Sequence, residues 1–226
     1  MDRFLLISEF AHKSFDVRNQ ARDMALTQAR QVIRNSSQAI RAIHRLEIDL
    51  ANEHLSQART LVEKLKTDLV DHPDLFYAGY TQDALKEYVE AMVTCALIQK
   101  QDIPLPEELD VEAAVYLNGL AEVTGELRRR CLDILRQGYS DESERLLGIM
   151  DEIYSLLITV DYPDALTNGL RRQTDLARGI VERTRGDITI SIREQRLTSA
   201  MKNLSKQLLQ EDLVPNTTEF STEDGD

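Results

Sequence analysis

The sequence is poor in residues that interrupt helices or build a sheet. It contains no Trp, five Pro and nine Gly among 226 residues, so signals for turns are sparse. Alternation of apolar and polar residues, the pattern of a half-buried strand, is nearly absent. One short candidate, DITISI at 187–192, runs into a segment with helical spacing. These shortages argue against a sheet and favour helices.

Cysteine and long apolar runs are also scarce. Cys95 and Cys131 are the two cysteines, and both lie in apolar helical segments, where a buried, reduced thiol is the common role. They give no disulfide framework, which fits a reducing compartment. The apolar patch in MDRFLLISEF is too short to span a membrane and lacks the features of a signal peptide. We therefore expect a cytoplasmic protein without a membrane partner.

Acidic residues outnumber basic ones, and the formal net charge is −12. Six of the 39 acids lie in the tail, 211–226, which has no Lys or Arg; the rest of the chain keeps 33 acids against 27 basic residues, a net charge of −6. Bulk charge therefore gives no sign of a nucleic-acid partner, and any basic site must be local. Because the tail is also rich in Ser, Thr, Asn, Gly and Pro, we predict that it is disordered.

Apolar residues recur at spacings of three and four almost throughout, which predicts an all-α fold. No change of composition and no repeat divides the chain, so we expect one domain over 1–210, followed by the tail. Ser140 or Asp141 is a good N-cap for one helix. The seven expected helices span about 15–46, 51–70, 81–101, 111–137, 141–159, 164–185 and 187–210.

Two pairs of glutamates stand out from this helical pattern. Glu87 and Glu90 lie three residues apart in the apolar stretch LKEYVEAMVTC, and Glu122 and Glu126 lie four apart in NGLAEVTGELRRRC. Each pair falls on one helix face, the second pair about 40° apart around the axis. Glycines in the second segment, at 119 and 125, often mark the close approach of another helix or a ligand.

A short link joins the two helices that carry these pairs, so the helices are expected to pack side by side and antiparallel. Four converging carboxylates would repel one another unless divalent cations intervened, and hard oxygen ligands suit Mg²⁺ or Mn²⁺. Such ions support hydrolysis of phosphodiesters. Spacing alone is more often explained by a solvated helix face. The apolar surroundings of the first pair favour a functional role.

The first helix carries a basic ridge on this acidic protein. Arg30, Arg34, Arg41 and Arg45 fall within about 60° of one another around its axis, and we call these four residues the arginine ridge. Arginines in a row can follow the phosphates of a nucleic acid through bidentate contacts. The alternative is a solvated face whose arginines pair with nearby acids. His44, near the end of the same helix, is interpreted as interacting with the helix dipole.

Four segments resemble the translin superfamily, and more closely its translin-associated factor X branch. ARQVIRNSSQAIRAIHR at 29–45 resembles the first helix of the family, and VERTRGDI at 181–188 resembles a Val-Arg-Gly-Glu-Ile stretch. LKEYVEA at 85–91 is similar to Gln-Glu-Tyr-Val-Glu-Ala of the branch. YLNGLAEVTGELRRRC at 116–131 is similar to Gly-Val-Ala-Asp-Leu-Thr-Gly-Glu-Leu. The resemblance covers about residues 15–205.

The resemblance implies a seven-helix subunit that assembles into a hollow, roughly octameric shell around single-stranded or short duplex nucleic acid. In the factor X branch it also implies Mg²⁺-dependent endoribonuclease activity. The implied catalytic acids fall on Glu87, Glu90 and Glu122, and the next glutamate of the motif, Glu126, is an extra metal ligand or supporting group. Arg30 and Arg45 match basic positions of the first helix.

One departure from the branch concerns the third acid. Glu122 stands where the branch has Asp, and its carboxylate moves by roughly 1.5 Å unless the backbone compensates. A misplacement of that size can cost about a hundredfold in rate. The cofactor expected is Mg²⁺, or Mn²⁺ if the change retunes the site.

Three functions are therefore compared. The first is a metal-dependent endoribonuclease whose arginine ridge binds RNA. The second is a non-catalytic shell, like translin, that binds RNA or single-stranded DNA. The third is a structural helical protein with four solvated glutamates. A homo-oligomer is expected for the first two, with or without a translin-like partner subunit.

Overall fold

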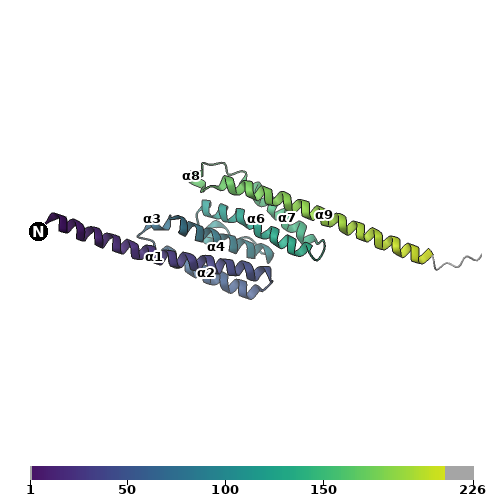
Figure 1. Ribbon diagram of the computed structural model, residues 1–226, viewed down its shortest axis with the longest axis horizontal. Coiled ribbons are helices and arrows are strands. Elements are labelled where there is room, and N and C mark those ends of the chain that lie inside the picture. The colour runs from purple at the N-terminus through teal and green to yellow at the C-terminus, as the bar shows by residue number, and fades with distance from the viewer. Residues whose placement is uncertain (1, 212–226) are drawn as a thin grey trace, which may run out of the picture.

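The computed structural model describes residues 2–211, which form helices and no strand (Figure 1). The predicted all-α fold is confirmed. Three single-turn helices, α3 (Pro73–Phe76), α5 (Pro106–Leu109) and α8 (Asp164–Thr167), lie in the connections. The six long helices are α1 (Arg3–His44), α2 (Ile48–Asp68), α4 (Gly79–Ile98), α6 (Ala113–Leu135), α7 (Asp141–Leu157) and α9 (Leu170–Glu211).

Three of the predicted helix boundaries are wrong. Helix α1 begins at Arg3 rather than near residue 15, because Asp2 caps it by accepting the Phe4 N–H and no helix breaker follows. The helix predicted over 164–185 is divided into the single turn α8 and the start of α9 at Leu170, and α9 then continues through Gly186 without a break into the last predicted helix. A glycine inside a helix costs only about 1 kcal/mol relative to Ala, too little to end it. Within 2–211 there are thus six long helices, not seven.

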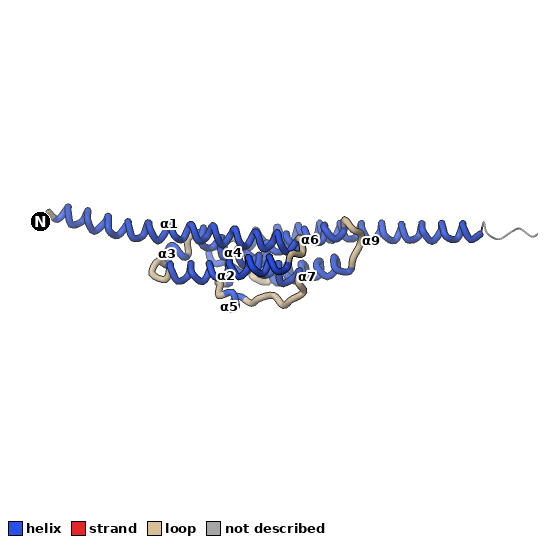
Figure 2. The backbone as a smooth tube through the Cα atoms, turned by 90° about the horizontal axis from the view of Figure 1, so that it is seen from below, coloured by secondary structure: helices blue, strands red, loops and turns tan. Residues whose placement is uncertain are grey.

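The helices pack as neighbours in an order that places α4 and α6 in the middle. Helix α1 packs on α2 and α4, α4 packs on α6, and α6 packs on α7 and α9. Figure 2 shows the bundle from a second direction, with α1 and α9 extending beyond it at opposite ends. The apolar character of α4 follows from its position, since most of its length is buried between α1 and α6.

Gly119 sets the distance between α4 and α6. A Cβ at this position would lie 2.9 Å from the Lys86 backbone oxygen and 2.9 Å from the Val89 side chain. Only glycine therefore permits this close approach of the two backbones. Gly125, which was expected to serve the same purpose, has open space where a Cβ would lie. Of these two glycines, only Gly119 lies where the two helices approach closely.

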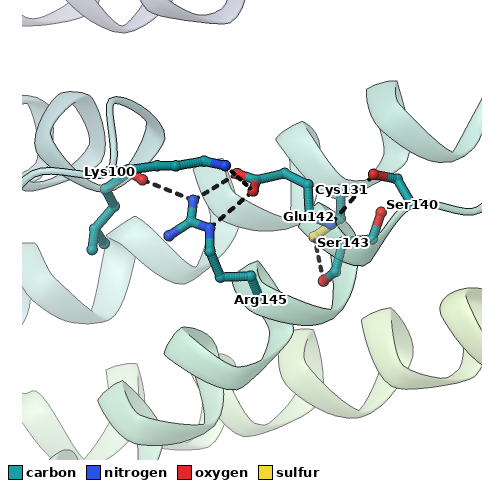
Figure 3. A network of polar contacts seen from close by, with 7 residues as sticks. Lys100, Cys131, Ser140, Glu142, Ser143 and Arg145 are labelled. Carbon is teal, nitrogen blue, oxygen red and sulfur yellow. Dashed lines mark hydrogen bonds and ion pairs between the residues drawn. The ribbon is translucent and has the colours of Figure 1, made fainter.

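The start of α7 is tied to the end of α4 by a network of polar contacts (Figure 3). Ser140 is the N-cap, as predicted, and accepts the N–H of Glu142. Glu142 pairs with Arg145 at 2.6 Å and with Lys100 at 3.0 Å. Arg145 also donates to the backbone oxygen of Leu97, 3.0 Å away. One carboxylate between two cations thus joins the two helices.

Both cysteines are free and buried, as predicted. Burial raises the pKa of Cys95 to about 12 and that of Cys131 to about 11, which makes them poor nucleophiles. No helix within the described residues has the length and apolarity that a bilayer crossing requires. The tail predicted to be disordered lies outside the described residues, except for Glu211, which ends α9.

Candidate functional site

The two acidic segments meet between α4 and α6. Glu87 and Glu90 from α4 and Glu122 from α6 each offer a carboxylate oxygen, and these oxygens all lie within 4.8 Å of one another. We call these three residues the carboxylate cluster. All three are half-buried, so the fully solvated face considered from spacing alone does not describe them. The close approach at Gly119 brings the two helices near enough for this contact.

The negative charge of the cluster is only partly offset by its surroundings, in which Lys86 is, among the described residues, the one cation that lowers the pKa of Glu90. Burial, followed by the charges of Glu87, Glu122 and Glu126, raises the pKa of Glu90 to about 8. Burial and the neighbouring Glu122 also raise the pKa of Glu87. Carboxyl groups that resist ionisation in this way are characteristic of functional sites.

The donor atoms of the cluster fit a divalent cation. Three carboxylate oxygens within 4.8 Å of one another are hard ligands of the kind that Mg²⁺ and Mn²⁺ prefer. A cation would also favour the ionised form of Glu90, because an opposite charge lowers the pKa of a carboxyl group. The residues present therefore fit the metal that the family resemblance implies.

Glu126 has a different environment from the other three glutamates. Its Oε2 atom lies 2.5 Å from His44 Nε2 and 3.6 Å from a guanidinium nitrogen of Arg129. The hydrogen bond with His44 lowers the pKa of Glu126 against the opposing effect of burial. The structure therefore places Glu126 beside the cluster, with its own partners.

His44 is a residue whose contact the sequence did not reveal. It does lie in the last turn of α1, but its side chain is only 3% exposed and contacts Glu126 of α6, 82 positions away. The interpretation as a simple dipole contact is thus incomplete. The available signal was that His44 and Arg45 end the segment that resembles the first helix of the family, and this resemblance does not identify the residue that His44 contacts.

Glu122 is held by two further residues that the sequence analysis did not select. Its Oε1 atom accepts hydrogen bonds from Lys86 Nζ at 2.8 Å and from the side-chain amide of Gln173 at 3.2 Å. Burial acts to lower the pKa of Lys86, but the hydrogen bond and the charge of Glu122 leave it raised. Lys86 is therefore a cation at the edge of the carboxylate cluster.

The arginine ridge is exposed along α1 and at its C-cap, Arg45. Arg30, Arg34, Arg41 and Arg45 all lie at the surface, and none of them forms an ion pair with another described residue. Arg18 and Arg22, nearer the start of the helix, pair with Asp74 and Asp23. Pairing with local acids therefore accounts for these two arginines but not for the ridge. Helix α1 packs against α4, which carries two of the clustered glutamates.

The chain belongs to the translin family, whose family model matches residues 10–184. It is 32% identical over 209 residues to an uncharacterised protein of Methanocaldococcus jannaschii, covering 91% of this chain and 90% of that protein. This confirms the family that the glutamate motifs indicated. Assignment to the factor X branch within it stays a prediction.

Solved structures show the same fold. The crystal structure of AfC3PO aligns with a TM-score of 0.76 at 33% identity, covering 84% of this chain and 98% of AfC3PO. A complex of AfC3PO with duplex RNA aligns with a TM-score of 0.75 at 34% identity, over 84% and 97% of the two chains. The apo form of NeC3PO shares the fold at 20% identity, with a TM-score of 0.73 over 81% and 96%.

Proposed function

We propose that this chain is a metal-dependent endoribonuclease that binds RNA within an oligomeric assembly. The observation that carries this proposal is the meeting of Glu87, Glu90 and Glu122, with oxygens within 4.8 Å of one another and more negative charge than the neighbouring Lys86 offsets. A purely structural helical protein would have no reason to bury like charges together, since their repulsion is destabilising.

RNA binding is supported by a second region. AfC3PO, a related protein of the same fold, forms a complex with duplex RNA. In this chain, the exposed and unpaired arginine ridge offers guanidinium groups to phosphates. We propose that this ridge binds the RNA backbone, single-stranded or duplex, and that the acidic charge elsewhere restricts binding to this face.

The proposed chemistry divides between the metal and the chain. A bound Mg²⁺ or Mn²⁺ would activate water and stabilise the charge that develops on the phosphate. Glu87, Glu90 and Glu122 would hold the cation, and Glu126 would support them from its contact with His44. The arginine ridge would orient the phosphodiester. Each role belongs to a group on α1, α4 or α6.

Cleavage of fluorescent RNA tests the proposal. The purified oligomer should cut single-stranded RNA with Mg²⁺ or Mn²⁺, and Glu90→Gln should lose this activity. Glu182→Gln is the matched control, because Glu182 is an exposed glutamate of α9 outside the cluster. Intact RNA with both metals would refute an endoribonuclease. A mass near that of one chain, 25.8 kDa, by light scattering would refute the oligomer.

The second candidate is a non-catalytic shell that binds RNA or single-stranded DNA. It is favoured by one observation, Glu122 at the position where the resembled branch has Asp. This candidate predicts salt-dependent binding without cleavage, unaffected by Glu122→Gln. An octameric arrangement and a translin-like partner subunit are compatible with both candidates, and co-purification with a translin homologue tests the latter.

A further inference from the structure

Helix α9, which has no role in the chemistry proposed above, reaches the carboxylate cluster through Gln173. Leu170 and Ala177 are buried in the core, each 1% exposed. Gln173 lies three residues after the first and four before the second, so it shares their face of the helix. Its side-chain amide donates to Glu122 Oε1 on α6 at 3.2 Å. The apolar pattern of α9 therefore directs this amide toward the cluster.

The start of α9 is fixed relative to Glu122 by a buried hydrogen bond. Asn118, which is 5% exposed, donates its side-chain amide to the backbone oxygen of Thr167 at 2.8 Å. Asn118 lies on α6 about one helical turn before Glu122. Thr167 belongs to the single turn α8, which leads into α9. The connection that precedes Gln173 is thus anchored to the helix that carries Glu122.

Glu122 is the acid of the cluster that has most need of support. Its side chain has one more rotatable bond than the Asp of the resembled branch, so holding its carboxylate in one place costs more conformational entropy. Gln173 from α9 and Lys86 from α4 both donate to Oε1. Among the described residues, none donates a hydrogen bond to Oε2. One oxygen is thus held from two helices, while the other keeps its lone pairs for a ligand.

Gln173 contributes position without charge. Its amide is neutral, so it leaves the negative charge of the cluster unchanged, whereas Lys86 offsets part of that charge. Loss of a hydrogen-bond partner that orients a metal ligand typically lowers metal affinity about 10- to 100-fold. Because replacing Lys86 would change charge and position together, Gln173 is the residue at which the effect of position can be measured alone.

We propose that Gln173 is a positioning residue of the metal site, and that its hydrogen bond to Oε1 holds Glu122 where the second oxygen can bind the cation. The inference rests on the proposed function, since it requires the carboxylate cluster to bind metal. Gln173 acts through Glu122. In this way a carboxylate that is one methylene further from the backbone than that of Asp is held in place by a residue of another helix.

Titration with Mn²⁺ tests the role of Gln173 without measuring activity. The electron paramagnetic resonance signal of free aqueous Mn²⁺ gives the dissociation constant of the oligomer. Gln173→Met keeps an unbranched side chain but removes the donor, and it should weaken Mn²⁺ binding about tenfold or more. Gln173→Asn keeps the amide on a shorter side chain and should also weaken binding. The control is Gln195→Met, at an exposed position of α9, which should leave the affinity unchanged.

A second background shows whether Gln173 acts through Glu122. In Glu122→Asp the carboxylate is withdrawn by roughly 1.5 Å, which takes it out of reach of an amide that is already 3.2 Å away. Adding Gln173→Met to Glu122→Asp should therefore change the Mn²⁺ affinity by less than about twofold, because the coupling between the two positions is lost.

The outcomes separate this inference from the proposed function. Unchanged affinity in Gln173→Met and Gln173→Asn would overturn the inference and leave the metal site intact; if one of these variants does not fold, the other gives the result. Equal weakening by Gln173→Met in both backgrounds would also overturn it, because Gln173 would then support the fold rather than Glu122. An absence of specific Mn²⁺ binding by the wild type would overturn the inference together with the proposed metal site.

Discussion

Glu90 and Glu142 are both half-buried glutamates, yet their surroundings are opposite. Glu142 lies between Arg145 and Lys100. Hydrogen bonds from both residues lower the pKa of Glu142, and the bond from Arg145 has the larger effect. Glu90 lies among other glutamates, and burial with their charges raises its pKa to about 8. The first carboxylate joins two helices, as a paired charge commonly does. The second forms no ion pair within the described residues, and this distinguishes it from a carboxylate in a structural ion pair.

The sharpest test of this comparison is to neutralise each glutamate. We expect Glu90→Gln to lower RNA cleavage by about a hundredfold or more, because a ligand oxygen is lost from the metal site. Glu142→Gln should leave cleavage within about twofold and cost about 1 kcal/mol of stability, since partly exposed ion pairs contribute little. Cleavage rates and chemical denaturation measure the two effects. Equal losses of cleavage in both variants would contradict the proposal that Glu90, unlike Glu142, acts in the functional site.

The second prediction concerns the two groups of arginines on α1. We consider a variant in which Gln replaces all four residues of the arginine ridge. RNA binding should weaken about tenfold. The slope of the logarithm of the binding constant against the logarithm of salt concentration should become shallower by about three, at roughly 0.7 per lost phosphate contact. Fluorescence anisotropy at several salt concentrations measures both quantities.

The control for the ridge is Arg18→Gln with Arg22→Gln, because these arginines already pair with Asp74 and Asp23. The pair of control changes should alter the salt slope by less than the ridge changes do, per arginine removed. An equal effect per arginine would mean that overall charge, rather than the free ridge, binds the RNA.

The two glycines of α6 give a third prediction. Gly119→Ala should destabilise the protein by about 1–3 kcal/mol, because the new Cβ meets the Lys86 backbone at 2.9 Å and must force α4 and α6 apart. Gly125→Ala should stabilise it by up to about 1 kcal/mol through helix propensity. Thermal and urea denaturation measure whether each variant lowers or raises the free energy of unfolding. Gly119→Ala should also weaken Mn²⁺ binding, whereas Gly125→Ala should not.

A further prediction is a pH dependence of the metal-free protein. The pKa of Glu90 is about 8 in the folded state against an ordinary value of 4.5, so folding favours the protonated form. Its stabilising contribution is present below about pH 4.5 and is lost as pH rises toward 8. In chelator, the melting temperature of the wild type should fall over this range more than that of Glu90→Gln.

Glu142 should show the opposite trend, because a carboxyl group with a lowered pKa loses its stabilising contribution as pH falls below its ordinary value. Glu142→Gln should therefore reduce the loss of stability in acid and leave the trend toward pH 8 unchanged. Melting temperatures measured over the same pH range compare the Glu90→Gln and Glu142→Gln variants directly. A matching trend in both would contradict the contrast between the two sites.

The sequence predicted the helical class and most of the helix positions because apolar spacing records which face of a helix is buried. It failed at helix ends that apolar spacing does not record, although the N-cap Asp2 was a local signal for the start of α1. Neither the early start of α1 at Arg3 nor the passage of α9 through Gly186 changes that spacing. The clustering of Glu87, Glu90 and Glu122 was expected from a short link between helices, and the structure shows the contact. Their role as metal ligands stays a prediction.

What the sequence determined by itself was the all-α class, the buried thiols and the family, since each depends on residue type and short-range spacing. The tertiary structure decided which charges balance one another. His44 and Glu126 are 82 positions apart, Lys86 and Glu122 are 36 apart, and Gln173 reaches Glu122 from a third helix. Electrostatic energy depends on distance in space and on burial, and only the packing of α1, α4, α6 and α9 sets these.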